Sequence, residues 1–123
     1  MNEPDLADRE CIPCTGDEEP LQGEALTGLY TQLDTAVWRV VDGHHLEGTY
    51  EFEEFRDAFE FTKEVGELAE TEWHHPEIHL SWGEVVIELW TYAIDGLFET
   101  DFIMAAHIDR IYEKHAPEKE SEY

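Results

Sequence analysis

The chain has few basic residues, few cysteines and no long apolar run. Seven lysines and arginines stand against 31 aspartates and glutamates among 123 residues, so the formal net charge is −24. Such a surface repels phosphate groups, so we expect no binding to nucleic acid or to a membrane. No stretch reaches the ~20 apolar residues of a membrane span, and the acidic residues 1–10 do not resemble a signal peptide. We therefore expect a cytoplasmic protein.

The acidic residues are spread along the whole chain rather than clustered. Their mutual repulsion destabilises a compact fold at low ionic strength and is screened at molar salt, where the Debye length falls to about 3 Å. We interpret this composition as that of a protein from a salt-accumulating halophile. The alternative is an acidic face for a basic partner, which fits an even distribution of acids less well.

The two cysteines, Cys11 and Cys14, form a single Cys-Ile-Pro-Cys sequence near the N-terminus. A structural zinc site needs four ligands, and the chain has no second cysteine pair. A redox pair typically opens a helix, whereas this pair lies in a segment rich in proline and glycine. We interpret residues 1–20 as an extended N-terminal arm, residues 21–117 as a single domain and residues 118–123 as a polar tail.

Apolar spacing predicts three helices and four strands in the remaining chain. The helical segments are residues 26–33, 53–70 and 100–115, and the strand-like segments are residues 37–41, 46–52, 78–82 and 84–91. Asp42-Gly43 is a strong hairpin signal, and Gly83 joins the second strand pair. Strands joined by hairpins are antiparallel. The order α-β-β-α-β-β-α therefore predicts an α+β two-layer sandwich, a four-stranded antiparallel sheet with three helices on one face.

Two adjacent histidines, His74 and His75, follow the second predicted helix, and Pro76 restricts the turn behind them. Histidine is the side chain whose ordinary pKa lies near neutrality, so this pair suits proton transfer. Glu70 precedes His74 by four residues. If the helix extends that far, the Glu70 carboxylate and the His74 imidazole share one face and contact each other.

Three interpretations of the histidine pair remain open. The histidines could be cations at a helix C-terminus, which the helix dipole favours. They could belong to a metal site, although the spacing matches no standard zinc pattern; its members would be Glu70, His74, His75 and His79. They could also act as acid and base beside a flat heterocycle. Three tryptophans could form an aromatic wall for such a ligand, although they could equally belong to the core: Trp38, Trp73 and Trp90.

Several short sequences resemble, in order and spacing, those of the pterin-4-alpha-carbinolamine dehydratase family. They are Glu70-x-x-x-His74-His75-Pro76, Trp82-Gly83-x-Val85, Leu89-Trp90-Thr91, Gly96-Leu97 and Asp101-Phe102. The resemblance covers nearly the whole chain. It implies dehydration of a 4a-hydroxytetrahydropterin to a quinonoid dihydropterin, without a metal or organic cofactor. It further implies tetrahydrobiopterin recycling, a functional link to an aromatic amino acid hydroxylase, and assembly as a homodimer or homotetramer.

The resemblance also implies site residues. Three histidines are typical of the family, and the third is replaced here by Tyr92, a phenol with an ordinary pKa near 10 and hence a poor base. The implied catalytic residues are His74, His75, Glu70 and Tyr92. The implied substrate contacts are Trp73, Pro76, Trp90, Thr91 and Ala93. Trp38 is a further candidate contact, because it is one of the tryptophans that could form the aromatic wall.

Two departures from the family pattern affect the expected function and the last helix. Loss of one acid/base group typically lowers a rate by 10²–10⁴-fold, so a pterin-binding or protein-interaction module is the alternative to an active dehydratase. Phe98 stands where family members usually have a serine or threonine that caps the last helix. We expect Thr100 to act as a substitute cap.

Overall fold

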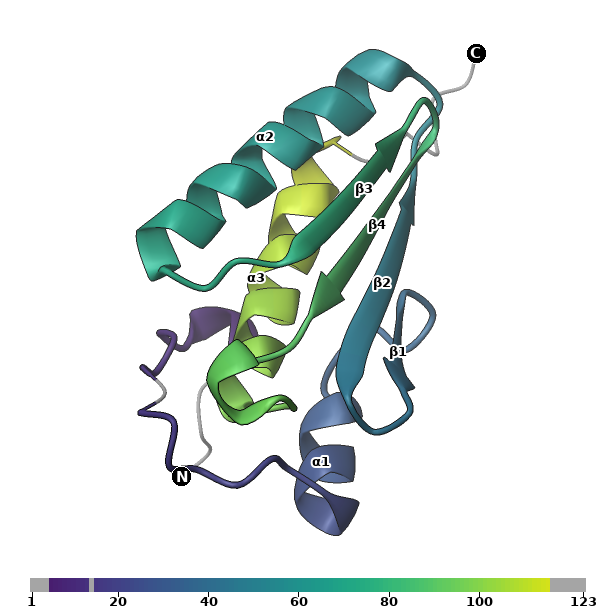
Figure 1. The fold of residues 1–123 in the computed structure, drawn as a ribbon. Helices are drawn as coiled ribbons and strands as arrows, with labels where there is room; N and C mark the ends of the chain where they lie inside the picture. Colours follow the sequence, from purple (N-terminus) through teal and green to yellow (C-terminus); the bar gives the residue numbers. More distant parts are fainter. Residues whose placement is uncertain (1–4, 14, 116–123) are drawn as a thin grey trace.

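The computed structural model describes residues 5–13 and 15–115, and Figure 1 shows their path. The elements are two 3-10 turns, η1 (Leu6–Asp8) and η2 (Tyr92–Ile94), helices α1 (Gly23–Tyr30), α2 (Phe55–Glu72) and α3 (Glu99–His115), and strands β1 (Trp38–Val41), β2 (His45–Glu51), β3 (Glu77–Ser81) and β4 (Glu84–Leu89). Within the described residues, no helix has the length and apolar character needed to cross a membrane. The predicted polar tail lies outside the described residues.

The four strands form one antiparallel sheet in the order β1-β2-β4-β3. Alternate residues of β4 are buried, namely Val85, Ile87 and Leu89, as a period of two requires for a strand with one buried face. The turn between β1 and β2 has positive φ at Asp42 (57°) and at Gly43 (66°). This is the backbone combination of a tight hairpin turn.

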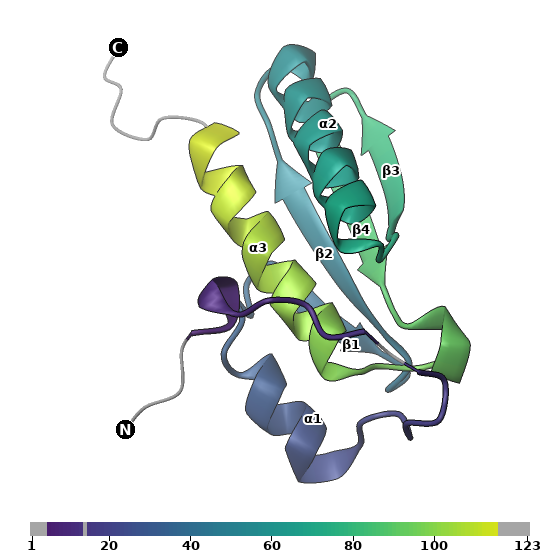
Figure 2. The same ribbon diagram turned by 90° about the vertical axis from the view of Figure 1, so that its left-hand side faces the viewer.

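Helices α2 and α3 lie side by side on one face of the sheet, while α1 lies near β1 and packs against α3 (Figure 2). The first half of α3 is almost wholly buried, because it lies between the sheet, α1 and the N-terminal segment. The predicted α+β class, with a four-stranded antiparallel sheet and three helices, is confirmed.

Trp38 belongs to the core and does not line the pocket at the end of α2. Its side chain is 1% exposed, and its ring lies over Gly48, where an added Cβ would come within 2.7 Å of ring carbons. The indole Nε1–H donates to Asp109 Oδ1 at 3.0 Å. A buried indole needs such an acceptor, and α3 supplies it. The expectation of an aromatic wall that includes Trp38 is therefore wrong.

Helix α2 ends at Glu72, two residues beyond the predicted end. Trp73 follows with a left-handed backbone (φ 55°, ψ 43°), which reverses the direction of the chain. The His74 N–H still bonds to the Ala69 carbonyl oxygen at 3.1 Å. The two histidines therefore lie on a turn after the helix rather than on its last face.

The N-terminal residues 5–13 run across α3 (Figure 2). Leu6 is 3% exposed and belongs to the core. His107 Nε2–H donates to the Arg9 carbonyl oxygen at 2.9 Å, and the Arg9 guanidinium pairs with Glu99 at 2.9 Å. This segment is thus fixed to α3 by apolar, hydrogen-bonded and ionic contacts.

Candidate active site

A cavity of about 500 Å³ lies where the end of α2, the end of β4 and the N-terminal segment meet. Its volume suits a small organic ligand. The lining residues are Cys11, Ile12, Pro13, Glu72, Trp73, His74, His75, Trp90, Thr91, Tyr92, Ala93 and Thr100. Seven residues that the sequence suggested for the site therefore share one pocket. Glu70 reaches it through His75, whereas Pro76 is not among the lining residues and Trp38 lies in the core.

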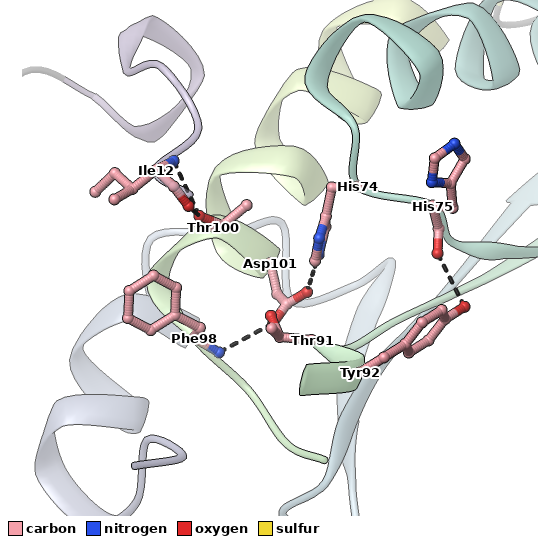
Figure 3. Close-up of polar contacts among 8 residues, drawn as sticks. All are labelled: Ile12, His74, His75, Thr91, Tyr92, Phe98, Thr100 and Asp101. Atoms are coloured by element: carbon pink, nitrogen blue, oxygen red, sulfur yellow. Dashed lines mark hydrogen bonds and ion pairs between the residues drawn. The ribbon is translucent and has the colours of Figure 1, made fainter. Parts of the chain in front are cut away.

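His74 is held by a buried carboxylate. Its Nε2 lies 2.5 Å from Asp101 Oδ1, and Asp101 is 0% exposed (Figure 3). An ionised carboxylate only accepts hydrogen bonds, so the proton of a neutral His74 ring is on Nε2. The Nδ1 atom then carries a lone pair that is free to accept a proton. The arrangement fixes both the orientation and the tautomer of His74, as a general base requires.

The other oxygen of Asp101 organises the start of α3. Oδ2 accepts hydrogen bonds from the Thr91 hydroxyl at 2.8 Å and from the Phe98 N–H at 2.9 Å. The bond to Phe98 is the backbone half of a capping box, in which a side chain in the first helical turn reaches back to the residue before the helix. Asp101 thus supplies this half of the box. The Thr100 hydroxyl bonds instead to the backbone of Ile12, so the expectation that Thr100 would cap the helix is wrong.

His75 pairs with Glu70. Its Nε2 lies 2.7 Å from Glu70 Oε2, and both side chains are more exposed than those of His74 and Asp101. The expected contact between Glu70 and His74 is therefore not formed, because α2 ends before His74 and the left-handed residue Trp73 turns the chain. Trp73 packs against the His75 ring at 5.1 Å between centroids.

Tyr92 is joined to the same turn. Its hydroxyl donates to the backbone carbonyl oxygen of His75 at 3.0 Å (Figure 3). Burial raises the pKa of the Tyr92 phenol, and the nearby charges of Glu77 and Asp101 raise it further. The phenol is therefore neutral at physiological pH, and its one proton is already engaged with the protein.

Cys11 contributes a neutral thiol to the pocket. Burial raises the pKa of this thiol to about 12, and the adjacent Glu72 carboxylate adds to the shift. A thiol that stays protonated is a poor nucleophile. Among the lining residues there is no lysine or arginine, whereas Glu72 lies at the wall and Asp101 lies just behind His74.

Several residues of this site were not assigned a role from the sequence. The sequence indicates Asp101 only as part of a short family-like sequence, and it does not predict that Cys11 to Pro13, Glu72 or Thr100 line the pocket. Asp101 was detectable in principle, because an acidic residue in the first turn after a non-capping Phe98 is a capping signal. Its contact with His74, 27 residues away, has no local signal.

The metal site considered from sequence is not assembled. His74 contacts Asp101, His75 contacts Glu70, and His79 lies on β3 with its Nε2 3.9 Å from Glu88 Oε1. Among residues 5–13 and 15–115, the group whose geometry could hold an ion is Glu77, His79 and Glu88, on the exposed face of the sheet. Of the four residues considered, only His79 belongs to that group.

Comparisons with known proteins agree on one family. A family model described as pterin 4 alpha carbinolamine dehydratase matches residues 19–111. A Rubrobacter xylanophilus protein named "Putative pterin-4-alpha-carbinolamine dehydratase" is 49% identical over 87% of this chain and 98% of its own length. A protein of the same name from Alkaliphilus metalliredigens is 44% identical over 85% of this chain and 94% of its own length.

A solved structure agrees with these sequence matches. The crystal structure titled "transcriptional coactivator/pterin dehydratase" from Brucella melitensis superposes with a TM-score of 0.70 and 29% identity, and covers 76% of this chain and 98% of that chain. The family match spans the whole sheet, the three helices up to Ile111, and most of the pocket. The chain therefore belongs to the pterin-4-alpha-carbinolamine dehydratase family.

Proposed function

We propose that this protein dehydrates 4a-hydroxytetrahydropterin to the quinonoid dihydropterin by acid/base catalysis with His74 and His75. The observation that carries the proposal is the contact between His74 and the buried Asp101 at the wall of a 500 Å³ pocket. Family membership supports a pterin as the substrate. The chemistry needs one proton donor and one proton acceptor, and the two histidines supply both.

In the proposed reaction, one proton enters and one leaves. The protonated His75 ring, stabilised by Glu70, donates to the 4a-hydroxyl, which departs as water when the C4a–O bond breaks. His74 Nδ1 accepts the proton from N5 as the C4a–N5 double bond forms. The carboxylate of Asp101 then stabilises the positive charge on the His74 ring. The aromatic residues Trp73 and Trp90 offer faces against which a flat pterin ring packs.

Tyr92 supports the turn that carries His75 rather than serving as the base. Its hydroxyl donates to the His75 carbonyl oxygen, so donation to the departing hydroxyl requires this bond to be exchanged. This contact also supports the alternative function. If the missing third imidazole is essential, the protein binds a pterin or a protein partner without turnover.

The test is the rate of 4a-hydroxytetrahydropterin dehydration in multimolar potassium chloride. We expect the wild type to exceed the spontaneous rate and His74→Ala to lower kcat by about 10²–10⁴-fold. His79→Ala, at an exposed histidine outside the pocket, is the matched control and should retain the wild-type rate. A silent wild type that gains activity in Tyr92→His would instead favour the non-catalytic alternative.

The remaining parts of the proposal concern the setting of the reaction. We place the protein in the cytoplasm of a salt-accumulating organism, in tetrahydrobiopterin recycling beside an aromatic amino acid hydroxylase. We also propose a homodimer or homotetramer, because β1 and β3 leave backbone groups at both edges of the sheet for pairing. Light scattering of the purified protein tests the assembly, and a monomer at micromolar concentration would contradict it.

A further inference from the structure

One wall of the pocket comes from the N-terminal segment rather than from the sheet or its helices. Cys11, Ile12 and Pro13 line the cavity together with the residues at the ends of α2 and β4. These three residues precede the part of the chain that matches the family model, which begins at residue 19. We call them the N-terminal wall.

A two-point contact fixes the N-terminal wall to α3. The Thr100 hydroxyl donates to the Ile12 carbonyl oxygen at 2.6 Å and accepts from the Ile12 N–H at 3.0 Å (Figure 3). Both bonds engage the backbone of Ile12, so they hold the segment whatever its side chain does. Thr100 is 4% exposed, and hydrogen bonds in such a position are shielded from competing water.

The anchor is adjacent to the proton-transfer residues without being one of them. Thr100 directly precedes Asp101, whose carboxylate holds His74. In the view of Figure 3, Ile12 and Thr100 lie on one side of the contact between His74 and Asp101, and Tyr92 lies on the other. The same turn of α3 therefore positions the imidazole and the N-terminal wall.

The wall is uncharged. Ile12 and Pro13 are apolar, and the high pKa of the Cys11 thiol, about 12, keeps it protonated at neutral pH. The wall therefore offers a ligand packing and exclusion of water but no proton donor or acceptor of suitable strength for the reaction. Its contribution belongs to binding rather than to proton transfer.

We propose that Thr100 is a positioning residue that holds the N-terminal wall, Cys11 to Pro13, against the pocket, and that this wall determines how tightly a pterin binds. The inference rests on the proposed function for the identity of the ligand. It assigns to the N-terminal segment a part in the binding site.

The first test is the binding of 7,8-dihydrobiopterin, followed by the fluorescence of the pocket tryptophans Trp73 and Trp90. Thr100→Val keeps the side-chain shape and removes both hydrogen bonds, and we expect it to raise Kd about tenfold. In dehydration assays KM should rise by a similar factor, with a smaller change in kcat. Thr62→Val is the matched control, because the Thr62 hydroxyl bonds only within α2, to the Ala58 carbonyl oxygen.

Two further measurements keep the outcome clear. Ile12→Ala shortens the wall at a side chain that is already 42% exposed, so it should fold normally and also weaken binding. The second measurement is the labelling of Cys11 by a neutral thiol reagent in a Cys14→Ser background. Labelling should be faster in Thr100→Val than in the parent, because the segment that contains Cys11 is no longer held. Added 7,8-dihydrobiopterin should slow the labelling of the parent.

The possible failures are distinguishable. If the wild type binds the pterin and both Thr100→Val and Ile12→Ala bind it equally well, the inference is overturned while the proposed function stands. If the wild type binds no pterin, the proposed function fails and the role of the wall in pterin binding fails with it. Equal labelling of Cys11 in Thr100→Val and its parent would overturn the anchoring by Thr100.

Discussion

Asp101 makes three contacts with its two carboxylate oxygens, and these contacts join the start of α3 to the His74 imidazole. Oδ2 accepts hydrogen bonds from Thr91 and from the Phe98 N–H, and Oδ1 contacts His74. Hydrogen bonds to both oxygens offset the free-energy cost of burying this carboxylate completely. A residue that first looks like a helix cap is therefore also the group that sets the His74 tautomer.

Replacing this carboxylate should impair His74 as the proposed base without unfolding the protein. In Asp101→Asn, the amide oxygen still accepts from Thr91 and Phe98, so the NH₂ group faces His74 Nε2. The His74 ring must then carry its proton on Nδ1, the atom proposed to accept the proton from N5. We expect kcat to fall by at least about 10²-fold with little change in KM, measured by steady-state kinetics.

The control is Asp95→Asn, at an exposed aspartate that also contacts a histidine, His44. This variant should keep the wild-type kcat, since neither residue lines the pocket. An Asp101→Asn enzyme with wild-type kcat would show that the tautomer of His74 is unimportant for turnover.

At the scale of elements, β1 and β2 fit together because Gly48 leaves room for Trp38. The two residues are paired in register, and the indole ring occupies the space that a side chain at position 48 would need. The close fit allows Trp38 to reach Asp109 on α3. The hairpin is thereby attached to the helix layer.

Gly48→Ala should therefore destabilise the fold. The added Cβ would lie 2.7 Å from the Trp38 ring, and overpacking of this kind typically costs about 1–3 kcal/mol. Gly66→Ala is the matched control, because no atom lies within 4 Å of its added Cβ and alanine is favoured in a helix by roughly 1 kcal/mol. Urea denaturation should show opposite shifts for the two variants, and equal shifts would contradict the packing argument.

Asp109 makes the contact between these elements sensitive to pH. Burial raises the pKa of its carboxyl group from 3.8 to about 6, with further contributions from Asp34 and Glu113, although the bonds from Tyr50 and Trp38 oppose the shift. The folded protein thus retains a proton that the unfolded chain loses near pH 4. The stability that this group contributes is present below about pH 4 and is lost as pH rises through about 6.

Asp109→Asn should remove this pH dependence, because the amide oxygen still accepts from Tyr50 and Trp38 while the titration is gone. We expect the free energy of unfolding of the variant, relative to that of the wild type, to increase by about 2 kcal/mol between pH 4 and pH 7. Urea titrations at a series of pH values measure it. A constant difference would mean that Asp109 titrates alike in both states.

At the scale of the whole molecule, the surface charge is dominated by acids, and the lysines and arginines of the described residues all form ion pairs. Each lysine and arginine in residues 5–13 and 15–115 forms an ion pair: Arg9 with Glu99, Arg39 with Glu47, Arg56 and Lys63 with Glu60, Arg110 with Asp8, and Lys114 with Glu64. Seven basic residues in the sequence are too few to offset the mutual repulsion of 31 acidic residues.

Salt should consequently stabilise the protein. We expect the Tm to rise by at least about 5 °C between 0.05 M and 2 M potassium chloride, because screening shortens the range of repulsion to a few Å. A variant with Glu53, Glu67 and Glu84 replaced by glutamine removes three exposed charges and should show a smaller rise. A Tm that does not depend on salt would contradict both this prediction and the proposed halophilic origin.

The sequence predicted the features that depend on neighbours in the chain. Apolar periodicity located the three helices and four strands, and the Asp42-Gly43 turn predicted an antiparallel hairpin, which the structure confirms. The adjacent His74 and His75 and the aromatic residues near them also drew attention to the region that now lines the pocket. Local spacing and turn chemistry carry this information because they act over a few residues.

Three features were decided only by the tertiary structure. Trp38 is core because α3 supplies Asp109 as its acceptor, and Glu70 contacts His75 because a left-handed residue ends α2 before His74. The pocket itself needs contacts between residues far apart in the chain, from Asp101 to His74 and from Thr100 to Ile12, 88 positions away. No local pattern specifies such partners, because they meet only when the helices pack on the sheet.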